Sequence, residues 1–322
     1  MTEFQGAPAP VVRMFGWVML SAMTAFIFNA ILTFWFDFPG AVALTSDGGF
    51  LAMVQVIIYL LAVGLAIYFV IRTPDVTLRS DAARVSAVNT FLIRAAFWVV
   101  LLVGFGDAIV SFLRVNRMLE DMVGPELAGN LGRAEFRGLY FHTPLIIVGI
   151  LIASVTRSLG FIWLTLLVVV AELLIVFSRF VFSYEQAFMA DLVRFWYGAL
   201  FLFASAYTLF EDGHVRVDLL YASMRREAKG RVNAWGSVLL GMLLCWTILI
   251  MGFSSSSSII VGPILVFEVT QSGFGMYVKY LMAGFLGVFA VTMMVQFVAQ
   301  FFEAVADKRG EPGARVTHAD MM

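Results

Sequence analysis

Residues 191–221 read DLVRFWYGALFLFASAYTLFEDGHVRVDLLY, and this stretch decides the fold class. The part at 195–210 carries no charged side chain, and with its flanks it is long enough to cross a bilayer as a helix. It is preceded by the pair Asp191 and Arg194 and followed by the polar motif HVRVD at 214–218. The stretch is therefore one membrane span that ends in a defined motif.

The composition extends this interpretation to the whole chain. Of its 322 residues, 61% are hydrophobic and only 13% are charged, and the mean hydropathy is +0.92, well outside the range of soluble domains. Lipid offers the backbone no hydrogen-bond partner, so only helices and closed barrels span a membrane, and long continuous apolar runs indicate helices. The first run, 14–36, is longer than the apolar part of a signal peptide, so we expect an uncleaved anchor.

We predict an all-α, polytopic membrane protein with about eight transmembrane helices and one amphipathic interfacial arm helix. The predicted spans are residues 14–36, 50–71, 88–113, 138–156, 159–181, 191–210, 234–253 and 277–303. The fourth span contains His142 and Pro144, and only three residues separate it from the fifth. That connection is short enough to be either a kink or a hairpin.

Loop charges predict the orientation, because short loops rich in Lys and Arg stay in the cytoplasm. Basic residues concentrate at 72–84, at 211–232 and after 306, whereas loops 37–49 and 254–276 contain no Lys or Arg. A topology of eight spans with both termini in the cytoplasm places these basic segments in the cytoplasm and the two loops without Lys or Arg outside. Loop 114–137 is the exception, since it carries four arginines on the outer side, balanced by four acidic residues.

Several function classes are disfavoured by the sequence. A net charge of −1 gives no reason to expect a nucleic-acid partner, and the single Cys245 cannot form a disulfide framework or a thiolate cluster. The three histidines, His142, His214 and His318, fall at or beyond predicted span ends, which is unsuited to a buried haem. Metal-site, phosphate-loop and nucleophile-elbow motifs are absent from the sequence. We therefore expect no enzyme, no cofactor and no metal site.

Four ionisable residues lie within predicted spans, where charge is costly: Arg94, Asp107, Glu172 and Arg179. Arg94 and Asp107 are about 140° apart around one helix axis, so each needs a partner elsewhere. Glu172 and Arg179 share one helix face, roughly 10 Å apart along the axis. We expect them to pair with groups on other helices or with a partner subunit; a proton or cation relay through Glu172 is the alternative.

The pair Asp191 and Arg194 has the i, i+3 spacing that brings two side chains together on one helix face. At the edge of a span such a pair anchors the helix at the headgroups or contacts another polypeptide.

Two connections have amphipathic helical spacing. In 214–232 the apolar stripe consists of Val217, Leu220, Tyr221, Met224 and Ala228, and the basic side chains lie away from it. We interpret this segment as an interfacial arm helix, which either anchors the chain to lipid alone or also grips a partner. In 114–137 a similar pattern breaks at Gly124-Pro125, and this outer loop could contact a soluble protein or be an inert hairpin.

Residues 159–306 resemble the small membrane subunit of tripartite ATP-independent periplasmic (TRAP) transporters, the DctQ-like family. The resemblance rests on four spans, a charged start to the second of them, and a His-Val-x-Val-Asp motif that leads into a basic arm. The matching residues are Asp191, Arg194, His214, Arg216, Val217, Asp218, Arg225 and Arg226. Two features depart from the family: the acidic residues Glu211 and Asp212 stand where basic ones are frequent, and about four additional spans precede the unit.

The resemblance implies a bacterial inner-membrane scaffold subunit of a sodium-driven organic-acid importer. Its partners would be a large permease subunit, which holds the substrate and sodium sites, and a periplasmic solute-binding protein. The alternative is an independent channel or carrier that uses the four intramembrane charges. A membrane sensor or assembly factor is a third reading, for which we would expect a soluble output domain.

The expected organisation has four parts. Residues 1–137 form an N-terminal membrane extension, 138–158 an additional span, 159–306 the four-span unit with its arm at 213–232, and 307–322 a cytoplasmic tail.

Overall fold

The computed structural model describes residues 6–46, 48–157, 161–185, 187–210, 221, 223–270 and 275–314, and every regular element among them is helical. Eight helices in this part of the chain are long and apolar enough to cross a membrane. They cover Pro10–Trp35, Gly49–Arg72, Leu78–Val115, Ala134–Val155, Ile162–Phe182, Ala187–Phe210, Arg226–Gly252 and Lys279–Lys308. The all-α fold with about eight spans is confirmed.

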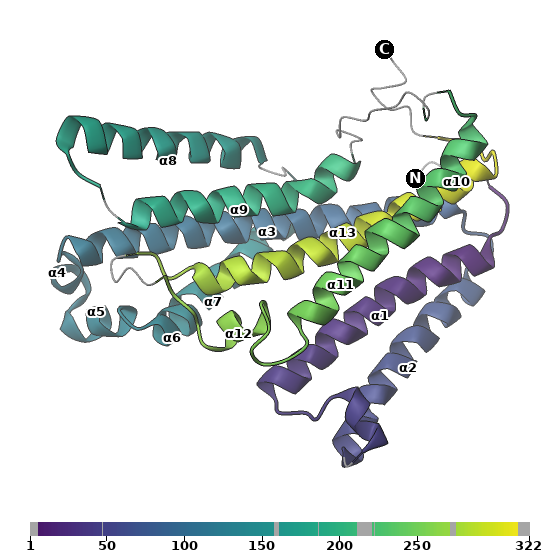
Figure 1. The fold of residues 1–322 in the computed structure, drawn as a ribbon, viewed down its shortest axis with the longest axis horizontal. Coiled ribbons are helices and arrows are strands. Elements are labelled where there is room, and N and C mark those ends of the chain that lie inside the picture. Colours follow the sequence, from purple (N-terminus) through teal and green to yellow (C-terminus); the bar gives the residue numbers. More distant parts are fainter. Residues whose placement is uncertain are drawn as a thin grey trace. The chain divides into compact units, whose positions relative to one another are not determined.

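The elements follow one another along the chain as labelled in Figure 1. Their bounds are α1 (Pro10–Trp35), η1 (Ala41–Thr45), α2 (Gly49–Arg72), α3 (Leu78–Val115), α4 (Leu119–Val123), α5 (Pro125–Leu131), α6 (Ala134–Phe136), η2 (Arg137–His142), α7 (Thr143–Val155), α8 (Phe161–Phe182), α9 (Ala187–Phe210), α10 (Arg226–Gly236), η3 (Ser237–Met242), α11 (Leu243–Gly252), α12 (Val261–Leu265) and α13 (Lys279–Lys308).

The chain divides into two compact units that interleave along the sequence. The first comprises residues 1–89, 208–247 and 293–322, and the second comprises 90–207 and 248–292. Each unit thus combines segments from before and after residue 159. The long helices α3 and α13 contribute to both.

In the first unit, α1 and α2 form a hairpin whose helices lie side by side (Figure 1). Polar groups hold the hairpin together: Asn29 Nδ2 donates to the Gln55 carbonyl at 3.2 Å, and Gln55 Nε2 donates to Thr33 Oγ1 at 2.9 Å. Within a membrane such interhelical hydrogen bonds favour association of the two helices. The backbone N–H of Gly40 in the connection also bonds Gln55 Oε1, at 2.8 Å.

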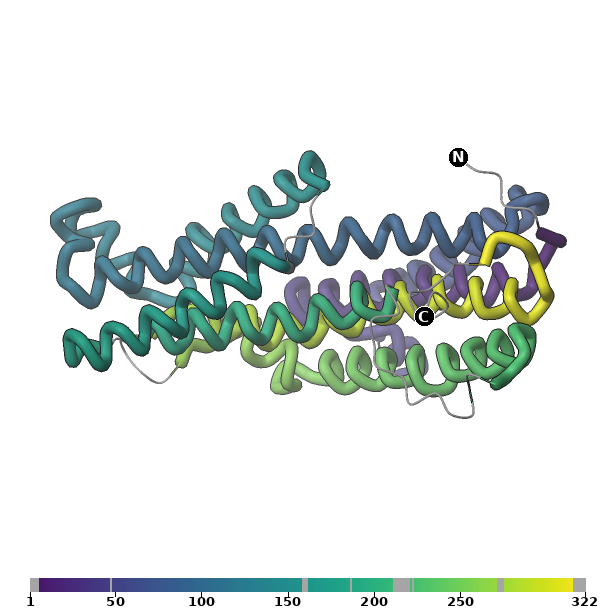
Figure 2. Tube along the Cα trace, turned by 90° about the horizontal axis from the view of Figure 1, so that it is seen from above, coloured from purple at the N-terminus to yellow at the C-terminus, as the bar shows by residue number. Residues whose placement is uncertain are grey.

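The same unit packs α10 tightly on the end of α13, and Figure 2 shows the two side by side. A Cβ atom added at Gly230 would lie 2.5 Å from Lys308 N and 2.6 Å from the Ala304 carbonyl oxygen. Only a residue without a side chain permits this approach of two backbones, as small residues do in membrane helix pairs.

The second unit is built around aromatic side chains of α9. Phe195, Trp196 and Phe203 are buried between α3 and the first half of α13, and the Phe195 and Phe285 rings lie 5.0 Å apart. Trp196 fits because Gly104 of α3 faces it: a Cβ atom there would lie 2.3 Å from Trp196 Nε1. The core therefore joins α3 to α9 and α13.

The segment between α3 and α7 breaks where the sequence predicts. Helix α4 ends at Gly124, which has a φ of +81°, and α5 begins with Pro125 at its first position. Glycine tolerates this backbone conformation, and proline suits a helix start. The apolar side chains Leu119, Ala128 and Leu131 then pack on Val110 of α3.

The predicted arm helix over 214–232 is only partly covered by the structure. Residues 211–220 and 222, which include most of it, lie outside the described residues. Tyr221 and residues 223–225 are not helical, and the helix that begins at Arg226 runs through η3 into α11. The helix α10 is held against α13 by the close approach at Gly230 and by Arg226, which bonds Asp307. The interfacial arm helix stays a prediction.

Candidate functional site

The second unit contains an enclosed charge cluster centred on Asp107 of α3. Asp107 Oδ1 accepts a hydrogen bond from Arg137 Nη1 at 2.9 Å and lies 3.0 Å from His142 Nε2. Asp107 Oδ2 accepts the backbone N–H of Tyr277 at 2.8 Å. The side chains of Asp107, Arg137 and His142 have no exposed surface. Both carboxylate oxygens of Asp107 thus have hydrogen-bond partners, as a buried polar group requires.

Aromatic side chains enclose the cluster. The Tyr280 hydroxyl lies 2.9 Å from His142 Nδ1. The Tyr277 ring is contacted by two guanidinium groups, with ring centroids 4.1 Å from Arg137 and 4.6 Å from Arg114. Arg137 Nε donates to the Leu131 carbonyl at 2.8 Å. The cluster therefore joins α3, α5, η2 and the start of α13.

A π-helical turn brings the two basic members of the cluster together. Arg137 and His142 are the first and last residues of η2. On an ordinary α-helix residues five apart point about 140° away from each other. The i→i+5 bonding of a π-turn brings them nearly over one another, and such turns recur at functional sites. Both side chains can then reach Asp107.

A second carboxylate, Asp191 of α9, binds the backbone amide of Met276, the residue before Tyr277. Asp191 Oδ2 accepts the backbone N–H of Met276 at 3.1 Å and the Thr270 hydroxyl at 3.2 Å. The backbone amides of Met276 and Tyr277 thus each donate a hydrogen bond to a carboxylate, Met276 to Asp191 of α9 and Tyr277 to Asp107 of α3. These amides directly precede the N-terminus of α13, where negative charge is favourable. The site fixes where α13 begins.

The pair Asp191 and Arg194 forms as its spacing predicts. Arg194 Nη1 lies 3.6 Å from Asp191 Oδ1. The two side chains differ in exposure, since Asp191 is buried and the Arg194 side chain is 70% exposed. Arg194 is therefore free to turn toward lipid headgroups or another protein.

The first unit has its own charge cluster, centred on Arg79 near the start of α3. Its guanidinium donates to Glu303, to Asp307 Oδ1 at 2.7 Å and to the Pro312 carbonyl at 2.8 Å. The Arg79 side chain is 1% exposed. Arg226 of α10 donates to the same Asp307 oxygen at 2.9 Å. This cluster ties the end of α13 to α3 and α10.

A related pair lies beside it in the same unit. Arg13 of α1 donates to Asp81 of α3 at 2.6 Å, and both side chains are buried. Trp17 Nε1 donates to the same carboxylate at 3.0 Å. The start of α1 is thereby fixed on α3.

The intramembrane charges do not converge on one site. Arg94 Nε donates to the Ala153 carbonyl of α7 at 2.8 Å, so it does not pair with Asp107, as their angular separation predicts. Glu172 is exposed on α8 and has no hydrogen bond or ion pair among the described residues. Arg179 lies 3.7 Å from Glu185 in the loop after α8. Neither Glu172 nor Arg179 pairs with another helix among the described residues, and their pairing with a partner subunit stays a prediction.

The motif residues are divided between described and undescribed parts of the chain. His214, Arg216, Val217 and Asp218 lie outside the described residues. Arg225 is exposed and caps the start of α10 with extended backbone.

Sequence reasoning singled out Asp107 but missed its partners Arg137 and His142, and it missed Arg79 at the centre of the other cluster. His142, expected at a span end, is buried well inside the helix that begins at Ala134. Arg137 and Arg79 were assigned to loops because their charge ends the apolar runs. One signal could have pointed to Arg137, which directly precedes the predicted span 138–156 in a chain with few charges, whereas Arg79 is eight residues from the nearest predicted span.

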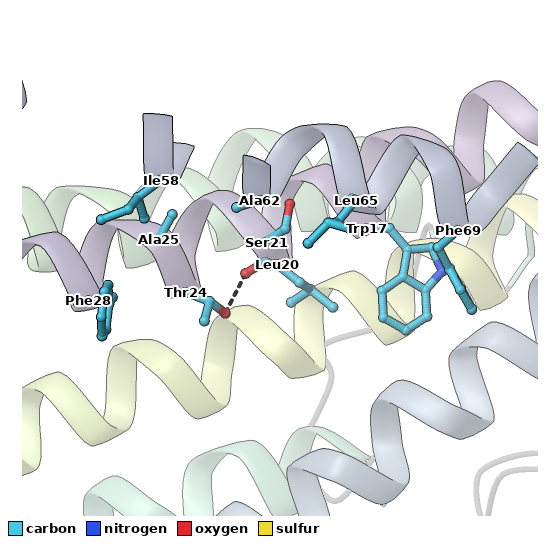
Figure 3. Close-up of a pocket in the computed structure, with 11 residues that line it drawn as sticks. Trp17, Leu20, Ser21, Thr24, Ala25, Phe28, Ile58, Ala62, Leu65 and Phe69 are labelled. Atoms are coloured by element: carbon cyan, nitrogen blue, oxygen red, sulfur yellow. Dashed lines mark hydrogen bonds between the residues drawn. The ribbon is translucent and has the colours of Figure 1, made fainter. Parts of the chain in front are cut away.

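An open groove lies between α1 and α2 in the first unit, and Figure 3 shows the side chains that line it. Its volume is about 590 Å³. The two hydroxyl groups in the lining, Ser21 and Thr24, donate to carbonyls of their own helix at 3.0 and 2.9 Å. The groove therefore presents an apolar surface, as a lipid-facing helix pair does.

Comparison with protein families gives one match. Residues 165–307 match the family model described as tripartite ATP-independent periplasmic transporters, DctQ component. Comparison of the chain with curated proteins and with solved structures gave no match. The matched range contains Asp191, Tyr277, Tyr280, Glu303 and Asp307, whereas Asp107, Arg137, His142 and Arg79 precede it. Both charge clusters thus join the matched range 165–307 to the helices before it.

Proposed function

We propose that this multi-span membrane protein, whose residues 165–307 match the DctQ component of TRAP transporters, acts as a fixed scaffold for the large permease subunit. The transported solute is delivered by a periplasmic binding protein, and uptake of an organic acid is driven by sodium. In this proposal the substrate and sodium sites belong to the large subunit.

The scaffold role is supported above all by two hydrogen bonds at the start of α13. The backbone amide of Met276 donates to Asp191, and that of Tyr277 donates to Asp107. The two carboxylates come from different helices, so any change in the position of α13 relative to α3 or α9 would leave buried charges without partners. Such a loss costs several kcal/mol. A subunit built this way resists deformation, which suits the static side of a moving transporter.

The helices before residue 165 belong to the same scaffold in this proposal. They supply Asp107, Arg137 and His142 to one cluster and Arg79 to the other. Separating these buried charges from their partners would cost several kcal/mol, which opposes independent motion of the extension. We therefore infer that the extension enlarges the scaffold.

Loop charges support an orientation with both termini in the cytoplasm of a bacterium, in the inner membrane. The third span then begins at the cytoplasmic face with Arg79 and approaches the outer face near Asp107. The basic start of α10, at Arg225 and Arg226, is cytoplasmic in the same orientation.

The competing function is an independent channel or carrier that uses Arg94, Asp107, Glu172 and Arg179. A conducting path needs charged groups that face one water-filled space. Asp107 is enclosed with its partners, Arg94 is bonded to a carbonyl, and Glu172 and Arg179 are on the exposed surface of α8. This arrangement favours the scaffold.

Reconstitution separates the two functions. We expect proteoliposomes with the chain alone to show no sodium-dependent uptake of any organic acid tested and no ionic current. Vesicles that also contain the large permease, supplied with the loaded binding protein, take up the solute when a sodium gradient is imposed. Uptake or current from the chain alone would favour the independent carrier.

A further inference from the structure

One acidic side chain in the middle of α8, Glu172, has no hydrogen bond or ion pair with any described residue. Glu172 lies ten residues from the end of α8 and eleven from its start. Its carboxyl group is therefore roughly 15 Å from either end of the helix. An ionisable group at that depth in lipid is costly, and in membrane proteins it almost always faces protein or water.

Only one side of α8 is covered by the rest of the second unit. Leu164 and Ala171 are its buried side chains, and Leu167, Val168 and Ile175 pack partly against the same core. On the outward side Ile162 is 85% exposed and Phe180 is 80% exposed. These apolar side chains are suited to lipid, but the carboxyl group of Glu172 is not.

On the side of α8 that carries Glu172, polar residues recur at regular intervals along the sequence. Thr165, Glu172 and Arg179 follow each other at intervals of seven residues, so they lie within about 40° of one another on the helix surface. A seven-residue repeat is the spacing by which one helix meets another in left-handed packing. The strip formed by these three residues therefore has the geometry of a helix-docking surface.

We propose that a transmembrane helix of the large permease subunit covers this strip and offers Glu172 a hydrogen-bond donor or a cation at mid-depth. The inference rests on the proposed scaffold function and adds the surface through which it acts. The occupant is a helix, because non-helical backbone exposed to lipid at that depth has no hydrogen-bond partner. A second copy of this chain fits less well, because two Glu172 carboxylates would face each other as like charges.

Photo-crosslinking on either side of α8 tests the position of the partner. Val176 and Leu166 are each 48% exposed, but Val176 lies about 40° from Glu172 around the helix and Leu166 about 120° away. The complex is purified with p-benzoylphenylalanine at position 176 or at position 166. We expect Val176→p-benzoylphenylalanine to crosslink to the large permease and the Leu166 variant to give little such product.

Substitution of Glu172 supplies the second readout. Because Glu172 contacts no other described group, Glu172→Gln and Glu172→Lys should leave the melting temperature of the isolated chain unchanged. We expect Glu172→Lys to reduce the ratio of co-purified permease to chain roughly fivefold or more, the scale of one interhelical polar contact in a membrane. Glu185→Gln, at an exposed carboxylate in the following loop, is the control and should leave the ratio unchanged.

The outcomes separate this inference from the proposed function. If the wild-type chain retains the permease while Glu172→Lys has no effect and position 176 crosslinks only to lipid, the strip is not the docking surface and the scaffold function stands. A crosslink between two copies of this chain would likewise overturn the inference in favour of self-association. If the wild-type chain retains no permease, the proposed function fails, and the inference fails with it.

Discussion

Asp107 Oδ1 and Arg137 Nη1 lie 2.9 Å apart, and neither side chain has exposed surface. The two residues are thirty positions apart in sequence. The contact forms because η2 turns Arg137 toward α3. It is the centre of the network that fixes the start of α13.

Removing one partner of this pair should destabilise the chain strongly. Arg137→Leu leaves the Asp107 carboxylate buried without its cation, and we expect a loss of about 3–5 kcal/mol in the free energy of unfolding. Denaturant unfolding in detergent, followed by tryptophan fluorescence, measures the change. Arg133→Leu, at an exposed arginine four residues earlier, is the control and should cost less than about 1 kcal/mol. Equal effects of the two substitutions would mean that the buried pair contributes nothing specific.

Two arginines of α3 should behave differently in the same assay. Arg79 is 1% exposed and bonded to two carboxylates, while the Arg84 side chain is 46% exposed and lies 3.8 Å from Asp81. We expect Arg79→Leu to cost about 3–5 kcal/mol, because Glu303 and Asp307 lose their shared cation. Arg84→Leu should cost at most about 1 kcal/mol. The reverse order would contradict the assignment of Arg79 as the centre of the cluster.

Two glycines of α10 provide a test of helix packing. A Cβ atom at Gly230 would press on the backbone of α13, whereas at Gly236 it would meet nothing within 4 Å. Gly230→Ala should therefore destabilise the chain by about 1–3 kcal/mol through overpacking. Gly236→Ala should stabilise it by up to about 1 kcal/mol, because alanine favours the helix. Thermal unfolding of both variants gives the comparison, and a stabilising Gly230→Ala would exclude the close approach of α10 to α13.

The two members of the Asp191 pair should have separate effects. Asp191→Asn weakens the hydrogen bond from the Met276 amide, so we expect it to lower the stability of the isolated chain by about 1–3 kcal/mol.

Arg194 is largely exposed, and Arg194→Glu should leave stability nearly unchanged while it reduces the amount of co-purified permease. Removal of His214 is expected to act like Arg194→Glu, with normal membrane insertion. If both variants retain the normal complex yield, Arg194 and His214 do not contribute to binding of the permease.

The membrane spans could be predicted from sequence because hydropathy and chain length alone determine them. All eight predicted spans correspond to long apolar helices. The break at Gly124-Pro125 was equally predictable, since it depends on two neighbouring residues and their backbone preferences.

The charge clusters could not be predicted in the same way. The contact between His142 and Asp107 depends on a π-turn, which shifts the side-chain directions that an α-helical period assumes. Arg79 and Asp307 are 228 residues apart, and no local pattern pairs them. The packing of α10 on α13 could not be predicted either, because amphipathic spacing does not distinguish a helix that lies on lipid from one that packs on another helix.

Co-purification from the native membrane tests the scaffold function most directly. The tagged chain is extracted in mild detergent, and the proteins that remain bound are identified and quantified by mass spectrometry. We expect one large polytopic permease in a fixed stoichiometric ratio to the chain. Recovery of the well-folded chain alone would contradict it and would make the independent carrier the better description.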